Sequence, residues 1–451
     1  MNLPLEFKKK YKEILSAEDY ERFIESFNNA PVSAYRINPL KNTEVYLKTN
    51  QDQSIPVSAH GFYGKISGKS AEHVTGLLYS QEPAAQVVAQ MANAKGNLKV
   101  LDLCAAPGGK STQLLSDLNN EGLLVSNEIS GKRSKVLVEN IERFGARNVI
   151  VLNETSERLA QVFPKFFDLI VIDAPCSGEG MFRKTPDAMT YWTEDYPKTC
   201  AILQREILSQ AMKMLSETGI LIYSTCTWSL EENEENVRWL LQNYPTLELV
   251  NLPHSDGLSE GIEMPEAIRC WPFLYSGEGQ FVAKVKNHGK NENVDTISSK
   301  PQKKNQKVAF NLSQEQMKLW QDFANKNLMF TYEKQNLQVF GENLYLLPTG
   351  LPPLKQLKIA RNGLHLGQFK KNRFEPSFAL GLALKPDEVK QSLEITSAQF
   401  KSYVSGATFS VSTDKKGWVQ LLIKENGLGF AKIVDGVVKN YFPKGLRFHV
   451  D

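Results

Sequence analysis

The sequence lacks the cysteine spacing of a zinc site, although it contains five cysteines. The nearest two, Cys176 and Cys200, are far apart and no CxxC occurs, so we expect neither a bound metal ion nor a disulfide framework. The chain also has no apolar run of about 18 residues or more, and its N-terminal segment lacks the apolar core of a signal peptide. These absences predict a cytoplasmic protein with free thiols, no membrane partner and a monomeric state.

The net charge of +3 is unevenly distributed along the 451 residues. Residues 1–283 contain 27 Lys and Arg against 36 Asp and Glu, a net charge of −9. Residues 284–451 contain 26 against 14, a net charge of +12. A basic C-terminal part is typical of a nucleic-acid contact surface, although solubilising lysines give the same composition.

The chain is long enough for several domains, and its pattern changes along its length. A small α+β pattern comes first, and strands then alternate with helices, which is typical of a doubly wound, Rossmann-like α/β sheet. A lysine-rich stretch follows, and a folded composition with many β-like runs returns after it. The predicted segments are an N-terminal α+β module (1–75), an alternating α/β domain (76–287), a linker (288–308) and two C-terminal parts (309–390 and 391–451).

Local patterns predict the individual elements of the alternating part. Ser229–Glu232 has the pattern of a capping box that opens a helix, and residues 44–47 of the N-terminal module have a β-like pattern. The predicted strands are 98–103, 122–127, 148–152, 167–172 and 218–225, and the predicted helices are 110–119, 131–144, 199–215 and 230–242.

Three short motifs stand where predicted strands end. They are Asp102-Leu-Cys-Ala-Ala-Pro-Gly-Gly-Lys-Ser-Thr112, Asp173-Ala-Pro-Cys-Ser-Gly178 and Ser224-Thr-Cys-Thr227. Because ligands of a doubly wound sheet bind at the carboxyl ends of its strands, we expect the three motifs to meet at one site.

The first motif has the look of a nucleotide-binding loop. A P-loop needs glycine where this chain has Cys104, and the pattern GxGxxG is absent. Glu128, at the end of the next predicted strand, is placed to accept hydrogen bonds from ribose hydroxyls. A glycine turn followed by such an acidic residue is typical of S-adenosylmethionine sites.

Two of the cysteines stand in a context that favours reactivity. Cys176 and Cys226 both follow predicted strands, and Cys226 precedes a predicted helix start, which would lower the pKa of its thiol. Cys200 and Cys270 have no such context and are expected to be small buried hydrophobes.

A methyl donor and a reactive thiol together suggest methylation of a pyrimidine at C5. A thiolate that adds to C6 makes C5 enamine-like, and C5 can then attack the methyl sulfonium. Asp173 can hydrogen-bond the pyrimidine edge and stabilise the adduct. The base must leave its stack to reach such a pocket.

With these motifs the chain strongly resembles the Sun-type RNA 5-methylcytosine methyltransferases. Arg36-Ile-Asn-Pro-Leu-Lys41 and Tyr79-Ser-Gln-Glu-Pro83 extend the resemblance over residues 30–287. Gly363-Leu-His-Leu-Gly367 and Asn440-Tyr-Phe-Pro-Lys-Gly-Leu-Arg447 resemble the bacterial RsmF branch, which modifies cytosine in small-subunit (16S) ribosomal RNA and ends in a PUA-like RNA-binding module.

The resemblance implies roles for individual residues. Cys226 is the expected nucleophile, Cys176 the residue that assists adduct breakdown, and Asp173 a group between cofactor and cytosine. Glu128 is expected to hold the ribose, and Thr155 stands where the family often has an aspartate near the adenine, with Asn153 or Glu154 as substitutes. The residues expected around the methionine part are Cys104, Ala105, Ala106, Pro107, Gly108, Gly109 and Lys110.

Other interpretations stay open at this point. The substrate can be transfer RNA instead of ribosomal RNA, and the Pro175–Cys176 pair also resembles the nucleophile motif of DNA cytosine methyltransferases. A non-catalytic ribosome-assembly factor is a further alternative. Arg183 and Lys184 are expected to steer RNA phosphates, whereas Tyr191 and Trp192 either stack on bases or, more commonly, pack against helices.

Overall fold

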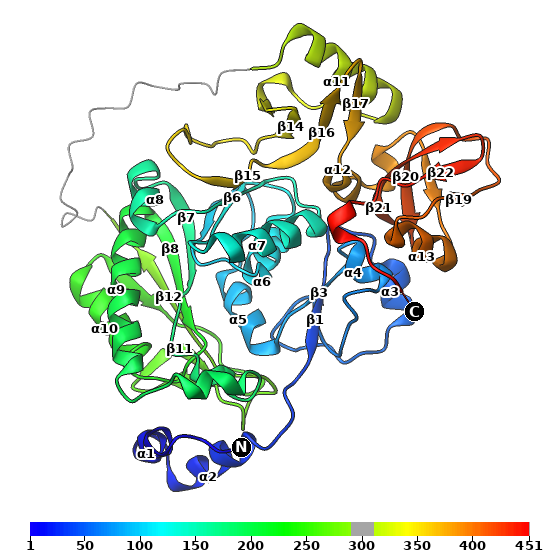
Figure 1. The fold of residues 1–451 in the computed structure, drawn as a ribbon. Coiled ribbons are helices and arrows are strands. Elements are labelled where there is room, and N and C mark those ends of the chain that lie inside the picture. Colours follow the sequence, from blue (N-terminus) through cyan, green and yellow to red (C-terminus); the bar gives the residue numbers. More distant parts are fainter. Residues whose placement is uncertain (290–310, 451) are drawn as a thin grey trace.

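A computed structural model describes residues 1–289 and 311–450. At its centre lies a ten-stranded sheet (Figure 1), whose parallel strands follow the order β8-β7-β4-β5-β6. The strand order reverses between β4 and β7, which is where doubly wound sheets bind their ligands. The parallel strands are β4 (Lys99–Asp102), β5 (Leu123–Asn127), β6 (Val149–Leu152), β7 (Phe167–Asp173) and β8 (Leu215–Thr225).

Antiparallel strands extend this sheet beyond β8. The strand β12 pairs with β8 and with β9, and β11 and β10 follow outward. Within this extension, β11 and β12 pair antiparallel, with Ile268 opposite Val282 and Cys270 opposite Gln280. These strands are β9 (Leu247–Val250), β10 (Leu258–Gly261), β11 (Met264–Cys270) and β12 (Gln280–Asn287).

Helices cover both faces of the sheet, and each face has its own hydrophobic core. One core lies under α5 (Pro83–Ala92), α6 (Gly109–Leu118) and α7 (Gly131–Phe144). The other lies under α8 (Ser156–Val162), α9 (Tyr196–Met214) and α10 (Glu234–Asn243). The predicted doubly wound, Rossmann-like α/β class is therefore confirmed.

Most predicted elements are present with small shifts at their ends. Two predictions are wrong, one of them in the N-terminal module, and one helix of the catalytic domain was not predicted. Residues 44–47 belong to a helix, α3 (Glu44–Thr49), instead of a strand. The helix α8 was not expected, because its seven residues carry only a short apolar pattern. The capping box at Ser229–Glu232 does not form, since α10 begins at Glu234 and is preceded by Asn233 without a side-chain cap.

The N-terminal part has two pieces. Helices α1 (Leu5–Ile14) and α2 (Ala17–Ser26) pack their aromatic side chains against aromatic residues of the catalytic domain, including Phe182, Trp192 and Trp228. A small antiparallel sheet follows, in the order β2-β1-β3, and it extends past the predicted boundary at residue 75. It consists of β1 (Ala34–Ile37), β2 (Gly61–Tyr63) and β3 (Leu78–Ser80), with the short helix α4 (Ala71–Val74) nearby.

The C-terminal part contains two further sheets and one strand that joins the central sheet. The strand β15 (Ile359–Arg361) pairs antiparallel with β6, which ties this part to the catalytic domain. A first sheet lies beside α11 (Gln314–Asn327) and contains β13 (Leu337–Phe340), β14 (Asn343–Leu346), β16 (Leu364–Lys370) and β17 (Arg373–Pro376). The predicted linker at 288–308 lies almost entirely outside the described residues.

A five-stranded sheet forms the last part of the chain, after helix α12 (Phe378–Ala383). Its strands follow the order β18-β20-β21-β22-β19. They are β18 (Ser392–Glu394), β19 (Phe409–Ser410), β20 (Gly417–Ile423), β21 (Asn426–Val434) and β22 (Val437–Lys439), with α13 (Ser397–Ser405) packed beside them.

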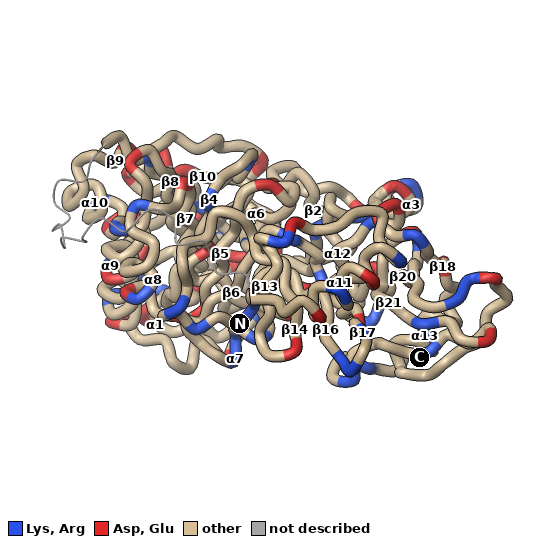
Figure 2. The backbone as a smooth tube through the Cα atoms, turned by 90° about the horizontal axis from the view of Figure 1, so that it is seen from above, with Lys and Arg blue, Asp and Glu red and all other residues tan. Residues whose placement is uncertain are grey.

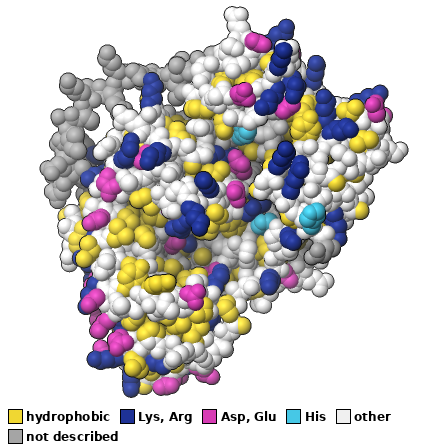
Figure 3. Space-filling view, viewed as in Figure 1, with side chains coloured by type: hydrophobic (Ala, Val, Ile, Leu, Met, Phe, Trp, Pro, Cys, Tyr) yellow, Lys and Arg dark blue, Asp and Glu magenta, His cyan; other side chains and the backbone are white. Residues whose placement is uncertain are grey.

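Seen from above, the catalytic and C-terminal parts lie side by side along the long axis of the molecule (Figure 2). On the face in Figure 3, Lys and Arg side chains are frequent over the C-terminal part, while hydrophobic side chains gather over the catalytic part. Within the described residues, no helix has the length and apolar character needed to cross a membrane.

Candidate active site

The carboxyl ends of the parallel strands surround a cavity of about 400 Å³. The three motifs that follow β4, β7 and β8 each contribute to its wall, as the topology of the sheet requires. The lining residues include Cys104, Ala106, Glu128, Glu154, Thr155, Asp173, Cys176 and Cys226. The structure therefore brings both cysteines, Asp173 and the acidic residue after β5 into one place.

The first loop holds the start of α6 in a fixed conformation. Gly108 precedes this helix with a φ of 115°, a backbone conformation that favours glycine. Arg36 of the N-terminal sheet is buried and donates to the carbonyl of Gly109 at 2.8 Å and to the hydroxyl of Thr112 at 2.6 Å. Arg36 is therefore a structural tie between the N-terminal module and this loop.

Only part of the predicted methionine-binding stretch faces the cavity. Among the described residues, Cys104 and Ala106 line it, while Ala105, Pro107, Gly108, Gly109 and Lys110 do not. Burial, followed by the nearby carboxylate of Asp102, raises the pKa of the Cys104 thiol, so this cysteine stays protonated. Cys104 thus provides an uncharged wall.

Asp173 lies between the first loop and the cysteine loops. Its Oδ2 pairs with the Lys110 ammonium at 2.7 Å, and its Oδ1 accepts from Ser224 at 2.9 Å and from Gln280 at 3.1 Å. Burial opposes the charge on Lys110, but the ion pair with Asp173 outweighs it and raises the lysine pKa. Lys110 therefore stays charged, and Asp173 is held in one orientation at the cavity wall.

The two cysteines of the later loops are in direct contact. The Sγ atoms of Cys176 and Cys226 are 3.3 Å apart. The hydrogen bond to Cys226 and then burial raise the pKa of the Cys176 thiol well above its usual value. Cys176 therefore keeps its proton near neutral pH and can donate it to the sulfur of Cys226.

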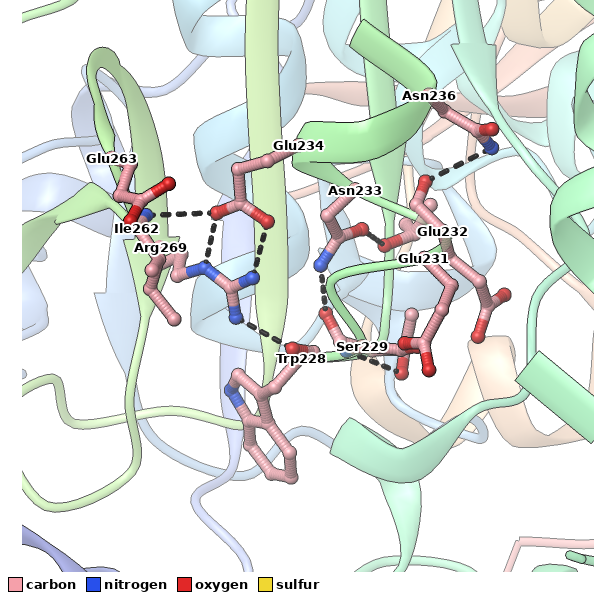
Figure 4. A network of polar contacts seen from close by, with 12 residues as sticks. Trp228, Ser229, Glu231, Glu232, Asn233, Glu234, Asn236, Ile262, Glu263 and Arg269 are labelled. Carbon is pink, nitrogen blue, oxygen red and sulfur yellow. Dashed lines mark hydrogen bonds and ion pairs between the residues drawn. The ribbon is translucent and has the colours of Figure 1, made fainter. Parts of the chain in front are cut away.

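The loop that carries Cys226 is anchored from behind (Figure 4). Glu234 and Arg269, both fully buried, form a bidentate ion pair, and Arg269 also donates to the carbonyl of Trp228 at 2.7 Å. Asn233 donates to the carbonyl of Thr227 at 3.0 Å. The Cys226 loop is thus held by side-chain contacts, since α10 begins only at Glu234 and does not directly follow the cysteine.

Glu128 combines burial with access to the cavity. Its Oε1 accepts from the amide of Ser130 at 2.8 Å, and its Oε2 lies 3.4 Å from Arg133. Its side chain is only 3% exposed. A carboxylate held in this way at the end of β5 suits the hydroxyls of a ribose, which donate hydrogen bonds.

The three candidates for the adenine contact differ in their availability. Thr155 lines the cavity and caps α8 through its hydroxyl, which accepts from the amide of Arg158 at 3.4 Å. Glu154 also lines it, but its Oε1 accepts from the amide of Lys358 at 2.7 Å. Asn153 donates to the carbonyls of Glu128 and Ile129 and is not among the lining residues.

The residues considered for RNA contact differ in their exposure. Arg183 is buried and pairs with Glu278 at 3.1 Å, so it is not available to a phosphate, whereas Lys184 is exposed. Trp192 is buried and donates to Glu179 at 3.0 Å, as a packing residue does. Tyr191 is 80% exposed.

The sequence patterns did not predict a cluster of four polar side chains that lies next to the cysteine loops. It consists of Ser177, Gln204, Thr227 and Glu232, which are buried and hydrogen-bonded to one another or to the cysteine loops. Ser177 and Thr227 each follow a cysteine directly, a signal that could have found them. No such signal marks the other two residues, because Gln204 lies in the middle of a helix and Glu232 fits the spacing of a capping box.

Family profiles match four stretches of the chain. The profile described as 16S rRNA methyltransferase RsmB/F matches residues 89–286. Those of the RsmF N-terminal domain, the RsmF first C-terminal domain and the RsmF PUA domain match residues 3–83, 322–384 and 390–448. The order of these profiles follows the order of the parts in the structure.

Individual proteins give the same result. The chain is 30% identical to ribosomal RNA small subunit methyltransferase F of Vibrio campbellii over 98% of this chain and 97% of that protein. The corresponding Escherichia coli protein is 31% identical over 84% and 80%. A methyltransferase homolog from Pyrococcus horikoshii superposes with a TM-score of 0.54 at 29% identity, over 60% of this chain and 92% of that one. NSun6 from Pyrococcus horikoshii, at 22% identity, shares the fold with a TM-score of 0.58 over 64% and 99%.

Proposed function

Since the chain belongs to the RsmF branch of the 16S rRNA methyltransferase RsmB/F family, we propose that it methylates C5 of a cytosine in small-subunit ribosomal RNA through a covalent adduct on Cys226. S-adenosylmethionine is the methyl donor of this family. The observation that carries the proposal is the contact between the Cys176 and Cys226 thiols at the wall of a cavity that also contains Asp173 and Glu128.

The cavity fits the cofactor by its donor set. Glu128 offers carboxylate oxygens to the ribose, and the uncharged Cys104 and Ala106 offer an apolar wall to the methionine part. Thr155 and Glu154 also line the cavity and are the candidates for the adenine contact. When bound, the cofactor supplies a methyl group on a positively charged sulfur.

The chain's own residues then prepare the cytosine. The Cys226 thiolate forms a bond to C6, and the electron pair of the C5–C6 double bond makes C5 the nucleophile that accepts the methyl group. Asp173, held by Lys110, Ser224 and Gln280, is oriented to hydrogen-bond the ring as charge develops on it. A base then removes the C5 proton, the electron pair of that C–H bond re-forms the C5–C6 double bond, and the S–C6 bond breaks so that its electron pair returns to the Cys226 thiolate.

Cys176 serves the second half of this cycle. Its thiol contacts the sulfur of Cys226 and keeps its proton at neutral pH. It is therefore placed to assist the departure of Cys226 from C6, while Cys226 forms the initial bond. The two cysteines have different roles, as the family resemblance implies.

The remaining parts bind the RNA. The C-terminal part carries the excess of positive charge and matches the RsmF PUA profile, which fits a surface that contacts phosphates. All the groups of the site come from one chain, so we infer a monomer. Its substrate places the protein in the cytoplasm.

Trapping on RNA tests the assignment of the cysteines. With a ribosomal RNA substrate and S-adenosylmethionine, Cys176→Ala is expected to accumulate a covalent protein–RNA complex on denaturing gels, and Cys226→Ala to form none. Cys200→Ala, a change at a buried cysteine outside the cavity, is the matched control and should behave as the unmodified protein. A stable complex with Cys226→Ala would overturn the proposal.

A deletion strain tests the substrate. Bisulfite sequencing of its ribosomal and transfer RNA should show the loss of methylation at a cytosine of the small-subunit RNA. Loss confined to transfer RNA would contradict the ribosomal assignment and leave the chemistry intact.

A further inference from the structure

Cys176 lies on a loop whose backbone is held on both sides of the cysteine. The carbonyl of Pro175, just before it, accepts from Nε2 of Gln204 at 3.0 Å. The amide of Ser177, just after it, donates to Oε2 of Glu232 at 3.0 Å. Gln204 and Glu232 come from different elements, α9 and the loop after β8, so each side of Cys176 is tied to a separate part of the domain.

The two holding residues are also bonded to each other. Nε2 of Gln204 donates to Oε2 of Glu232 at 2.7 Å, and Oε1 of Gln204 accepts from Asn236 at 2.8 Å. The bond from Asn236 fixes the orientation of the Gln204 amide, so that its NH2 group faces the loop. Gln204 and Glu232 are both buried, which strengthens these bonds by excluding water.

A second link joins the two cysteine loops. The hydroxyl of Ser177 donates to that of Thr227 at 2.9 Å, and Thr227 donates to Glu179 at 2.7 Å. Each of these hydroxyl residues directly follows a cysteine. The backbone around Cys176 and the backbone around Cys226 are therefore connected on the side away from the cavity.

We propose that Gln204 and Glu232 are positioning residues that clamp the Cys176 loop and keep its thiol in contact with Cys226. Neither residue lines the cavity. The consequence for catalysis, slower release of the RNA from Cys226, rests on the proposed function. The clamp itself is a property of the protein without RNA.

Glu232 could act through its two hydrogen bonds or through its negative charge, and its geometry distinguishes these two explanations. Its Oε2 accepts both hydrogen bonds, whereas its buried Oε1 has no hydrogen-bond partner among the described residues. In Glu232→Gln the amide oxygen can take the place of Oε2 and keep both bonds, while Glu232→Ala removes them. A clamp therefore predicts that the glutamine variant is nearly normal.

A thiol-oxidation experiment tests the clamp without RNA. Diamide takes two electrons and two protons from a pair of thiols, and the resulting Cys176–Cys226 disulfide is measured by peptide mass mapping. Gln204→Leu and Glu232→Ala should form it about tenfold more slowly, because a misplacement of about 1 Å between reacting groups can cost up to 100-fold in rate. Glu232→Gln should match the unmodified protein within about twofold.

Gln420→Leu is the matched control. Gln420 is fully buried in the last sheet, and its Nε2 also bridges two acceptors, the carbonyls of Gly381 and Leu384, both at 2.8 Å. It lies outside the catalytic domain, so its variant should oxidise at the normal rate even if it melts at a lower temperature. Normal disulfide formation in Gln204→Leu and Glu232→Ala would overturn the clamp, as would a Glu232→Gln variant that is as slow as Glu232→Ala.

Adduct trapping links the clamp to the reaction. Gln204→Leu and Glu232→Ala should accumulate the covalent RNA complex as Cys176→Ala does, since Cys226 can still attack C6. If Cys176→Ala traps no complex, the proposed function fails while the oxidation result still decides on the clamp. If Cys176→Ala traps a complex and the two clamp variants do not, the positioning role in release is overturned and the proposed function stands.

Discussion

The two sides of the active site are built differently. On the cofactor side, formed after β4, β5 and β6, Glu128 and Thr155 face an open cavity and are held mainly by neighbouring backbone amides. On the cysteine side, formed after β7 and β8, Gln204 and Glu232 lie behind the reactive groups and bond to the loops and to each other. The first side is a surface for binding, and the second is an internal frame.

This difference follows from what each side must do. A cofactor enters and leaves in every cycle, so its contacts must be accessible to a ligand from solvent. The thiols stay in the protein, and their mutual distance must be the same in every cycle, which a buried, hydrogen-bonded frame provides. Substitutions on the cofactor side should therefore change affinity, and those on the cysteine side should change the rate of chemical steps.

Asp173 stands between the two sides, and its loss should have the largest effect. Asp173→Ala leaves the nearly buried Lys110 ammonium unpaired, and breaking a buried ion pair costs about 3–5 kcal/mol, or roughly 150- to 5,000-fold in turnover if it acts at the transition state. Single-turnover methylation measures it. Gln280→Leu, which removes one hydrogen bond from Asp173 and leaves the ion pair, is the control and should lose about tenfold or less. Equal losses in both variants would show that orientation, and not charge, is what Asp173 contributes.

Asp102, under the cofactor loop, should make stability depend on pH. Burial raises its pKa from 3.8 to about 7, although Ser111 donates to Oδ2 at 2.6 Å. Because the folded protein holds this proton more tightly than the unfolded chain, the carboxyl stabilises the fold fully below pH 3.8. This stabilisation is lost as the pH rises through about 7, and the free energy of unfolding then falls by at most about 4 kcal/mol. Urea unfolding at several pH values measures this loss.

Asp102→Asn should remove this part of the pH dependence. The unmodified protein and the variant should differ most above pH 7, where the unmodified carboxyl must be buried with its charge. Burial also raises the pKa of Glu232, on the cysteine side, to about 7. Glu232→Gln should therefore remove a second part of the pH dependence of stability. Identical pH profiles for Asp102→Asn and the unmodified protein would contradict the assignment of the effect to Asp102.

Sequence patterns predicted which residues meet at the edge of the sheet better than they predicted the frame behind them. Motifs at strand ends are local in sequence, so Cys176, Cys226 and Asp173 could be placed at one edge from the alternation of strands and helices alone. Their mutual contact and the pairing of Asp173 with Lys110 depend on side-chain packing, which no local pattern contains.

The frame escaped prediction for a physical reason. Glu232 fits the spacing of a capping box, yet the chain continues as an irregular loop to Asn233 because Arg269 draws Glu234 into a buried ion pair. Likewise, arginine side chains often bind phosphates, but Arg36 and Arg183 are buried and form their hydrogen bonds and ion pairs inside the protein. Long-range partners of a charged residue decide its role, and they become visible only when the chain is folded.

Glu128 tests the cofactor side directly. Glu128→Gln replaces charge-assisted hydrogen bonds to the ribose by neutral ones, and a loss of about 1.5–3 kcal/mol corresponds to roughly 10- to 100-fold weaker binding of S-adenosylmethionine. Calorimetric titration measures the Kd. Glu157→Gln makes the same change at an exposed residue of the same cavity and should bind nearly normally. Equal affinities for the two variants would place the ribose elsewhere.

Thr155 should give the smallest effect, and it also decides between the adenine contacts. Thr155→Val keeps the shape of the side chain but removes the hydroxyl, so S-adenosylmethionine should bind about fivefold more weakly, equivalent to about 1 kcal/mol. Thr155→Ser retains the hydroxyl, which also caps α8, and should bind normally, which separates the loss of the hydroxyl from a change in the size of the side chain. If Glu154→Gln weakens binding and Thr155→Val does not, the carboxylate of Glu154 supplies the contact, in spite of the hydrogen bond it already accepts from Lys358.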